Sequence, residues 1–550
     1  MVSFPWVASC FSRGRRRFLQ RLTASSALLM LGRHSSAANT VPTLTGTDFK
    51  LVIAETPVNF TGAVRLATTI NGSVPGPILY WREGDTVMLQ VENRLKEDTS
   101  IHWHGIILPY QTDGAPGISF KGIAPGETFT YRFKVKQSGT YWYHSHSGMQ
   151  EQTGLYGAIV IEPLTETLSV DRDYIIQLSD WTDEDPYAVF AKLKKQSDYY
   201  NFNQQTVFDF IDDALNEGVS VAFAKRRMWN AMRMAMTDLA DISAYTYTYL
   251  INGAPPSRHW TGLFKPGERV RLRFINSAAQ TFFDVRIPGL AMTVVHADGQ
   301  PVEPVVVDEF RMGPAETYDV IVEPKADVYT LFAQSMDRSG FAVGALAVQT
   351  SLEVAVPEFD RPVPLSMTDM MGSMRQDVAV RHASSEYGAS VDMRVDTPRV
   401  NLDDPGVGLR NNGRRVLTYA DLRSVSGILS QRPPDREIEL HLTGNMERYS
   451  WSLDGVEFGD STPIHFRYQE CLRIIFVNDT MMAHPMHLHG MWSDLESPSG
   501  DVQVRKHVIV VQPAQRVSFR VQADALGRWP WHCHLFYHMH AGMFRVVVVA

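Results

Sequence analysis

The sequence predicts an all-β fold class, with three consecutive Greek-key β-sandwich domains and a small helical insertion in the second. Two observations lead to this prediction: apolar and polar residues alternate over short segments, and one pattern recurs three times along the chain. Alternation at period two, with turn residues about every ten positions, is typical of antiparallel sandwiches. A chain of 550 residues has room for about three or four domains.

Each copy of the pattern opens with a turn and continues into an alternating strand that ends in asparagine. The turns lie at Asn71-Gly72, Asn252-Gly253 and Asp454-Gly455, and the strands end at Asn93, Asn276 and Asn478. The copies also close alike, over residues 141–146, 329–334 and 529–534. The first and third closing segments contain histidines where the second has Phe332 and Gln334. We therefore expect the chemistry in the first and third domains and a structural role for the second.

These repeats set the predicted domain boundaries. The three domains span residues 39–165, 166–350 and 396–550, and residues 187–240 form the helical insertion in the second. Residues 351–395 are predicted to be a linker, because prolines and glycines interrupt any regular pattern there. The linker contains Met367, Met370, Met371 and Met374, whose Gly, Ser and charged neighbours offer no obvious core.

The first 38 residues predict an export signal. Arg15-Arg16-Arg17 precedes a mildly apolar run from Leu22 to Leu31, and small residues that suit a signal peptidase end at Ala38. This order is typical of a twin-arginine signal, so we expect a periplasmic protein. No later segment approaches the roughly 18 uninterrupted apolar residues that a membrane span needs.

Composition excludes several classes of protein. The formal charge of −8 argues against nucleic acid as a partner, because neutralising phosphates needs clustered Lys and Arg. The three cysteines, Cys10, Cys471 and Cys533, are too few for a disulfide-built scaffold. Cys471 stands alone on a predicted strand, and we expect it to be a buried apolar thiol.

Four clusters of potential metal ligands occur in the first and third domains. Their members are His102 and His104, then His144 and His146, then His484, His487 and His489, and finally His532, Cys533, His534, His538 and Met543. Two histidines that flank one residue of a strand point to the same face, because side chains alternate. Two such pairs from each domain would place eight imidazoles at an interface. Imidazole suits copper, zinc, iron or nickel, so the histidines alone do not identify the metal.

Cys533 narrows the choice of metal. Its side chain points to the strand face opposite that of His532 and His534. With His484, His538 and Met543 it makes a His₂Cys set with a weak thioether, which is the ligand set of blue-copper electron-transfer sites. The backbone then joins a thiolate site on one face to imidazole sites on the other.

The four clusters resemble those of the multicopper oxidases, the family of laccases, ascorbate oxidase and bacterial cuprous oxidases. The resemblance covers the whole mature chain, and residues 232–241, 391–396 and 403–413 resemble the periplasmic copper-resistance protein A branch. It implies cupredoxin-like domains and four copper ions per chain, one of type 1, one of type 2 and two of type 3. By resemblance, the type 1 ligands are His484, Cys533, His538 and Met543, the type 2 ligands are His102 and His487, and the type 3 ligands are His104, His144, His146, His489, His532 and His534.

The family implies one-electron oxidations at the type 1 copper, in which Cys533 takes part, and four-electron reduction of O₂ to water at the trinuclear cluster. The expected electron donor is Cu(I) or a small phenol, in the service of copper resistance, with other periplasmic copper-handling proteins as further partners. Two alternatives remain: a laccase-like phenol oxidase, and a copper-sequestering protein that does not turn over. A two-domain nitrite reductase is excluded by the three repeats.

Two further residues bear on the chemistry. Asp113 matches the acid that relays protons in related enzymes, although an aspartate before Gly114 is equally typical of a turn. His540 departs from the resemblance, because an acid is expected two residues after His538 in this branch. His296 and His507 are expected to be ordinary histidines.

Methionine thioether is a soft ligand that selects cuprous ion. Beside the linker methionines, Met228, Met232 and Met236 are predicted to share one face of a helix. Met481, Met482, Met486 and Met491 bracket His484. The hypothesis is that these groups recruit Cu(I), with packing in the core as the alternative for the helical group.

Overall fold

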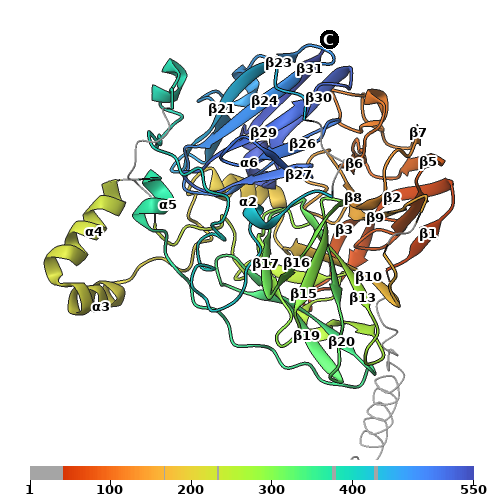
Figure 1. The fold of residues 1–550 in the computed structure, drawn as a ribbon, viewed down its shortest axis with the longest axis horizontal. Coiled ribbons are helices and arrows are strands. Elements are labelled where there is room, and N and C mark those ends of the chain that lie inside the picture. The colour runs from red at the N-terminus through yellow and green to blue at the C-terminus, as the bar shows by residue number, and fades with distance from the viewer. Residues whose placement is uncertain (1–40, 166–167, 232–234, 374–379, 426–430) are drawn as a thin grey trace, which may run out of the picture. The chain divides into compact units, whose positions relative to one another are not determined.

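The computed structural model describes residues 41–165, 168–231, 235–373, 380–425 and 431–550. The described strands form six β-sheets, in three pairs that follow one another along the chain (Figure 1). The predicted leader lies outside the described residues. No helix in the described part combines the length and apolar character needed to cross a membrane.

The first pair of sheets is built from nine strands. They are β1 (Thr43–Thr45), β2 (Asp48–Val58), β3 (Arg65–Ile70), β4 (Ile78–Arg82), β5 (Thr86–Asn93), β6 (His102–His104), β7 (Thr128–Lys134), β8 (Gly139–His144) and β9 (Tyr156–Glu162). They form the sheets β3-β2-β5-β7 and β1-β4-β9-β8-β6. Buried residues alternate along β5, as the sequence pattern predicts for a strand with one face on the core.

The second pair contains eleven strands. They are β10 (Arg172–Trp181), β11 (Thr248–Ile251), β12 (Trp260–Leu263), β13 (Val270–Asn276), β14 (Phe283–Arg286), β15 (Met292–Ala297), β16 (Gln300–Val307), β17 (Glu309–Met312), β18 (Thr317–Val322), β19 (Val328–Ser335) and β20 (Phe341–Ala347). They form the sheets β11-β10-β13-β18-β15-β16 and β12-β20-β19-β14-β17.

The third pair also contains eleven strands. They are β21 (Arg436–Asn445), β22 (Ser450–Leu453), β23 (Ile464–Phe466), β24 (Cys471–Asn478), β25 (His484–Leu488), β26 (Ser493–Glu496), β27 (Val502–Lys506), β28 (Val508–Val511), β29 (Arg516–Gln522), β30 (Gly527–Cys533) and β31 (Phe544–Val549). They form the sheets β22-β21-β24-β29-β26-β27 and β23-β31-β30-β25-β28. Cys471 is buried at the start of β24, as predicted.

One topology recurs in the three pairs, as the repeated pattern predicts. β2, β10 and β21 pair in parallel with β5, β13 and β24, which pair antiparallel with β7, β18 and β29. In the second sheet of each pair, β6-β8-β9, β14-β19-β20 and β25-β30-β31 occupy equivalent places. The sheets are thus mixed rather than purely antiparallel, because Greek-key connections return some strands in the same direction.

The repeated turn residues have a common structural role. Asn71, Asn252 and Asp454 have φ values of 52°, 51° and 53°, and the side chain of each accepts a hydrogen bond from the neighbouring strand. The asparagines that end the next strand then hold the loop that follows. Asn478, for example, donates through Nδ2 to the Met482 carbonyl at 2.7 Å, which fixes the chain just before His484.

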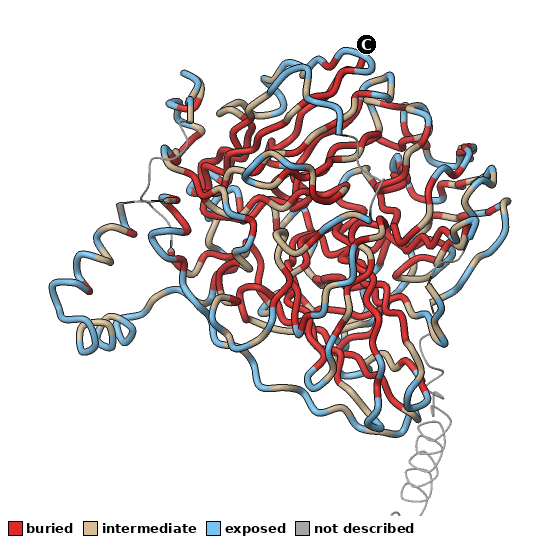
Figure 2. Tube along the Cα trace, viewed as in Figure 1, coloured by how far each residue is buried: buried red, intermediate tan, exposed pale blue. Residues whose placement is uncertain are grey.

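The predicted helical insertion is confirmed. It contains α2 (Pro186–Leu193), α3 (Val207–Glu217) and α4 (Val219–Ala231), and α3 and α4 project from the sandwiches with mostly exposed residues (Figures 1 and 2). The predicted shared helix face of methionines is wrong, because Met236 lies buried in a turn and not in a helix. Met232 and Met234 lie outside the described residues.

The remaining helices are short. They are α5 (Met367–Met371), α6 (Phe536–His540) and the 3₁₀ turns η1 (Tyr110–Thr112), η2 (Pro256–Arg258), η3 (Ser384–Tyr387), η4 (Tyr419–Asp421) and η5 (Phe458–Asp460). Within α5, Met367 and Met371 are about half exposed, at 48% and 46%, whereas Met370 is fully buried. Met374 lies outside the described residues.

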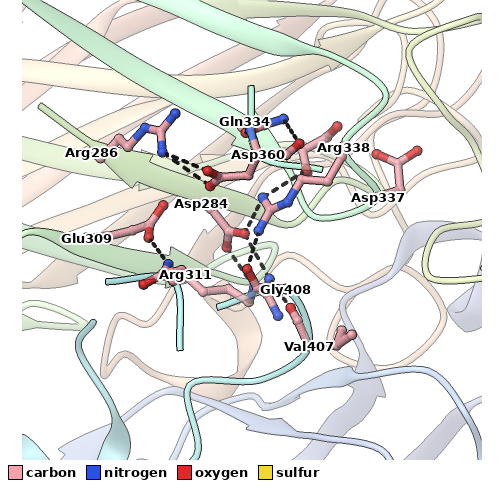
Figure 3. A network of polar contacts seen from close by, with 12 residues as sticks. Asp284, Arg286, Glu309, Arg311, Gln334, Asp337, Arg338, Asp360, Val407 and Gly408 are labelled. Carbon is pink, nitrogen blue, oxygen red and sulfur yellow. Dashed lines mark hydrogen bonds and ion pairs between the residues drawn. The ribbon is translucent and has the colours of Figure 1, made fainter. Parts of the chain in front are cut away.

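An ion-pair network involves residues on and next to β14 and β19. These two strands of the second pair of sheets correspond to the histidine-bearing strands of the first and third pairs. Asp284 accepts hydrogen bonds from Arg311 at 2.7 and 2.8 Å, and Arg338 Nη1 lies 2.5 Å from Oδ2 of the same carboxylate (Figure 3). The same two arginines donate to the carbonyls of Val407 and Gly408. The network therefore fastens a distant segment of the chain to the second pair.

A second part of this network binds the segment that follows β20. Asp360 lies 3.2 Å from Arg286 Nη1, and its backbone carbonyl accepts from Gln334 Nε2 at 3.2 Å (Figure 3). Arg414 also contacts Asp360 and donates to Glu309 at 2.7 Å. These contacts show what Gln334 does in place of a ligand histidine, in line with the structural role expected for the second domain.

We predict that Asp284→Ala lowers the thermal unfolding temperature by about 5–10 °C, because it removes the shared carboxylate partner of Arg311 and Arg338 at a cost of about 3–5 kcal/mol. Burial raises the pKa of Asp284. The charges and hydrogen bonds of Arg311 and Arg338 lower this pKa by more, so that it lies below its usual value. A lowered pKa means that the pairs stabilise the fold above the unfolded value of about 4 and are lost as the pH falls. Differential scanning calorimetry at pH 7 measures the effect. The exposed Asp327→Ala is the matched control, and equal unfolding temperatures for the two variants would contradict the role of the network.

Candidate metal centres

Strand pairing brings the predicted histidines together within each of two sheets. In the first pair of sheets, β6 and β8 are antiparallel and place His102 opposite His144. In the third pair, β25 and β30 are antiparallel and place His487 opposite His532. His146 and His534 follow the ends of β8 and β30, and His489 follows β25.

The two histidine-bearing sheets face each other across one interface. The rings of His102 and His489 stack with their centroids 3.9 Å apart, and those of His104 and His487 stack at 3.8 Å. The ring of His146 lies 5.1 Å from that of His532, and the ring of His534 lies 5.0 Å from that of His144. The eight imidazoles that the sequence predicts at an interface therefore form one cluster, the imidazole cluster, with members His102, His104, His144, His146, His487, His489, His532 and His534.

The imidazole cluster is chemically suited to metal ions. Burial lowers the pKa of most members well below the usual value, and that of His532 to about 4, so these rings are neutral at pH 7. Buried polar atoms normally have hydrogen-bond partners. Six members have buried ring nitrogens without one, namely His102, His104, His144, His146, His487 and His534. Groups of three within the cluster bring their ring nitrogens within 4.8 Å of one another. Neutral imidazoles with unused nitrogens that face each other fit metal coordination.

In three members of the cluster, a second ring nitrogen lies close to an oxygen atom. Nδ1 of His102 lies 2.8 Å from the Asp113 carbonyl, and Nδ1 of His489 lies 2.9 Å from the Asp113 carboxylate. Nδ1 of His144 lies 2.6 Å from the Glu151 carboxylate. A metal-bound histidine typically donates its other N–H to such an oxygen, which fixes the ring orientation. Asp113 thus contacts two cluster members, and it is almost fully buried.

Cys533 lies in a second centre on the other face of β30. Its Sγ is 3.5 Å from His484 Nδ1 and 4.0 Å from His538 Nδ1, and these two nitrogens are 3.3 Å apart. Met543 is fully buried, and its backbone bonds to both Cys533 and His538. Burial raises the pKa of the Cys533 thiol well above its usual value, so a bound cation is needed to hold it as a thiolate. The two imidazoles and the thiol fit a copper site, in which a thioether is the usual weak further ligand.

Residues from distant segments orient this second centre, the thiolate centre. Asp241 Oδ2 lies 2.9 Å from His538 Nε2 and also accepts from Tyr449 and Gln280. Trp451 stacks on the His538 ring at 3.8 Å. Thr480 Oγ1 lies 2.7 Å from His484 Nε2. Both imidazoles of the centre therefore have a fixed second nitrogen.

Sequence reasoning missed several of these residues. His507, expected to be an ordinary histidine, is buried with Nδ1 3.2 Å from His104 Nε2, and it forms a possible ligand group with His104 and His487. Nothing in its local sequence marks this contact, which joins residues 403 positions apart. Glu151 follows the second histidine cluster closely and could have been noticed on that ground. His296 lies on β15, 3.6 Å from Asp319.

His540 is exposed at the end of α6, and its ring packs edge-on against Phe536 at 4.6 Å. This is the position where the resemblance to the copper-resistance branch predicts an acid.

Comparisons with known proteins show the family of the chain. Family models described as "Multicopper oxidase" match residues 52–166, 172–351 and 431–550. The chain is 53% identical to "Copper resistance protein A" of Escherichia coli over 97% of this chain and 99% of that protein. It is 54% identical to "Copper resistance protein A homolog" of Pseudomonas syringae pv. tomato, again over 97% and 99%.

Solved structures agree in fold. The laccase from Botrytis aclada superposes with a TM-score of 0.62 at 22% identity, covering 93% of this chain and 89% of its own. The matched family models span most of the sequence, and the full-length relatives exceed half identity. The chain therefore belongs to the multicopper oxidase family, and it is an oxidoreductase whose cofactors are copper ions.

Proposed function

We propose that this protein is a periplasmic multicopper oxidase of copper resistance, which couples the one-electron oxidation of Cu(I), and of phenols, to the reduction of O₂ to water. One observation carries the proposal: Cys533 contributes its side chain to the thiolate centre, while His532 and His534, its neighbours in the chain, belong to the imidazole cluster. A storage protein has no need for a covalent connection between a one-electron centre and a larger cluster.

The proposed copper ligands follow from the two centres and the family. Four copper ions are proposed per chain. Type 1 copper is assigned to His484, Cys533, His538 and Met543, type 2 to His102 and His487, and the type 3 pair to His104, His144, His146, His489, His532 and His534. When bound, these coppers would supply single-electron transfer at the thiolate centre and reduction of O₂ at the imidazole cluster.

The protein's own residues have three tasks in this proposal. Asp241 and Thr480 hold His538 and His484, so that the thiolate centre keeps one geometry in both oxidation states. The chain from Cys533 to His532 and His534 provides the shortest covalent path for electrons. Asp113 holds His489 and His102, and its buried carboxylate is proposed to deliver protons to the imidazole cluster.

A pocket next to the segment that precedes His484 supports Cu(I) as the donor. Its lining includes Met481, Met482 and Ala483, which directly precede His484. Leu365 and Asp369, at and just before α5, line the pocket as well. The outer face of α5 exposes the thioethers of Met367 and Met371. Exposed soft ligands therefore lie on an element that also borders this pocket.

The similar proteins and the predicted export signal support the proposed location and role in the cell. The two relatives quoted above are named copper resistance proteins and match over nearly their whole length. Residues 1–38 have the sequence of a twin-arginine signal, and they lie outside the described residues. Export to the periplasm would place the enzyme where it converts Cu(I) to the less permeant Cu(II).

We predict that Cys533→Ser abolishes the intense visible absorption of the copper-loaded protein and lowers O₂ consumption by at least 100-fold with either Cu(I) or a phenol. Serine cannot supply the soft thiolate, whereas the surrounding sandwich does not depend on it. Absorption spectroscopy and an oxygen electrode measure both effects. Cys471→Ser is the matched control, because that thiol is also buried but does not belong to the thiolate centre. A blue, active Cys533 variant would refute the proposal, and an inactive wild-type protein that binds copper would favour sequestration.

His104→Ala and His146→Ala should keep the blue absorption but stop O₂ reduction, because each removes only a ligand of the imidazole cluster. The exposed His465→Ala serves as the control. Visible absorption reports the thiolate centre, and O₂ uptake reports the cluster. Loss of the blue absorption in either cluster variant would show that the division into two centres is wrong.

Replacing both Met367 and Met371 by Leu should raise the KM for Cu(I) several-fold and leave phenol oxidation nearly unchanged, because only Cu(I) binds thioether. Steady-state O₂ uptake with each donor provides the measurement. Met370→Leu is the matched control on the same helix, since this side chain is fully buried. Equal effects on both donors, or on neither, would contradict a role for α5 in Cu(I) recruitment.

A further inference from the structure

Two histidines and two carboxylates meet at a place separate from both copper centres. His382 and Glu386 belong to the segment around η3, whereas His441 lies on β21 and Asp479 directly follows β24. The side chains of His382 and Glu386 are 5% and 1% exposed, and those of His441 and Asp479 are 3% and 0% exposed. These four residues, the His₂–carboxylate₂ cluster, thus form a buried junction between the segment and the third pair of sheets.

Four atoms, one from each residue, approach one another closely. His382 Nδ1 lies 2.7 Å from Glu386 Oε2 and 3.6 Å from Asp479 Oδ2. His441 Nδ1 lies 2.6 Å from Asp479 Oδ2 and 3.3 Å from Glu386 Oε2. Ligands bound tetrahedrally at about 2.0–2.1 Å from a metal ion are about 3.3 Å apart. The four nitrogen–oxygen distances bracket this value.

The outward ring nitrogens of both histidines lie near carboxylates but make no hydrogen bond to them. His382 Nε2 lies 3.5 Å from Asp396 Oδ1, and His441 Nε2 lies 3.5 Å from Glu439 Oε1. Asp479 Oδ1 accepts from the Val395 amide at 2.8 Å, which leaves Oδ2 for the junction. A carboxylate behind each imidazole is the usual surrounding of a metal-bound histidine.

Charge gives a further argument. Two buried carboxylates carry two negative charges, which require either two protonated imidazoles or one divalent cation with neutral imidazoles. A single divalent ion supplies the positive charge that two protonated imidazoles would otherwise supply.

We propose that His382, Glu386, His441 and Asp479 bind a divalent transition-metal ion, Zn²⁺ or Cu²⁺, that is distinct from the proposed copper centres. Two imidazoles and two carboxylates form a suitable ligand set for both ions. The ion joins residues 382–386 to the third pair of sheets, which contains the thiolate centre. Asp479 is the first residue of the turn that leads to His484. This site stands independently of the proposed oxidase activity.

The test compares the copper-loaded wild-type protein with His382→Ala, so that copper already fills the imidazole cluster. Both proteins are equilibrated with ZnCl₂, desalted and analysed for metal content by mass spectrometry. We expect one zinc ion per wild-type chain and at least a 100-fold weaker zinc affinity in His382→Ala. A second arm without zinc identifies Cu²⁺ as the occupant if wild type holds one copper more than the variant. His465→Ala, an exposed histidine, should match wild type in both arms.

Equal metal contents of wild type and His382→Ala in both arms would overturn the site and identify the four residues as a doubly protonated ion-pair cluster. If His382→Ala fails to fold, zinc X-ray absorption of the wild-type protein decides. Two imidazoles among N/O ligands at about 2.0 Å support the site, and a sulfur ligand or absence of imidazole overturns it. The visible absorption of the same samples tests the thiolate centre separately, so the failure of one proposal is distinguishable from the failure of the other.

Discussion

The architecture depends on keeping neutral imidazoles buried, with unused nitrogens, where the first and third pairs of sheets face each other. Burial lowers the pKa of these rings, and the strand pairs β6–β8 and β25–β30 fix their separation. Buried nitrogens without partners destabilise a fold, so bound metal ions would stabilise this one. Oxygen atoms from Asp113 and Glu151 hold the opposite nitrogens and keep the unused ones directed inward.

The second pair of sheets shows how the same topology serves another purpose. Strands β14 and β19 occupy the places of the histidine-bearing strands, but Asp284 and Gln334 there join an arginine network. The network binds residues near Asp360 and Val407, which connect the second and third pairs. The second pair thus holds the connecting segments in place, and Asp241, which also precedes β11, reaches the thiolate centre from it.

Much of this arrangement is predictable from sequence because it depends on local pattern. Alternation and the turns at Asn71, Asn252 and Asp454 predict the three sandwiches, and histidine spacing predicts which rings share a strand face. Contacts between distant segments leave no such trace: His507 meets His104, and His382 meets Asp479, only through tertiary packing. The predicted methionine face is wrong because Met236 lies in a turn, which residue spacing alone does not reveal.

The central claim is that one cysteine joins a thiolate copper centre to a trinuclear cluster between two sandwiches. Anomalous X-ray diffraction from crystals of the copper-loaded protein, recorded on both sides of the copper absorption edge, tests it most directly. The account predicts one copper peak bounded by Cys533, His484 and His538, and three peaks among the eight rings of the imidazole cluster. A single peak at Cys533 with none in the cluster, or peaks distant from Cys533, would contradict it.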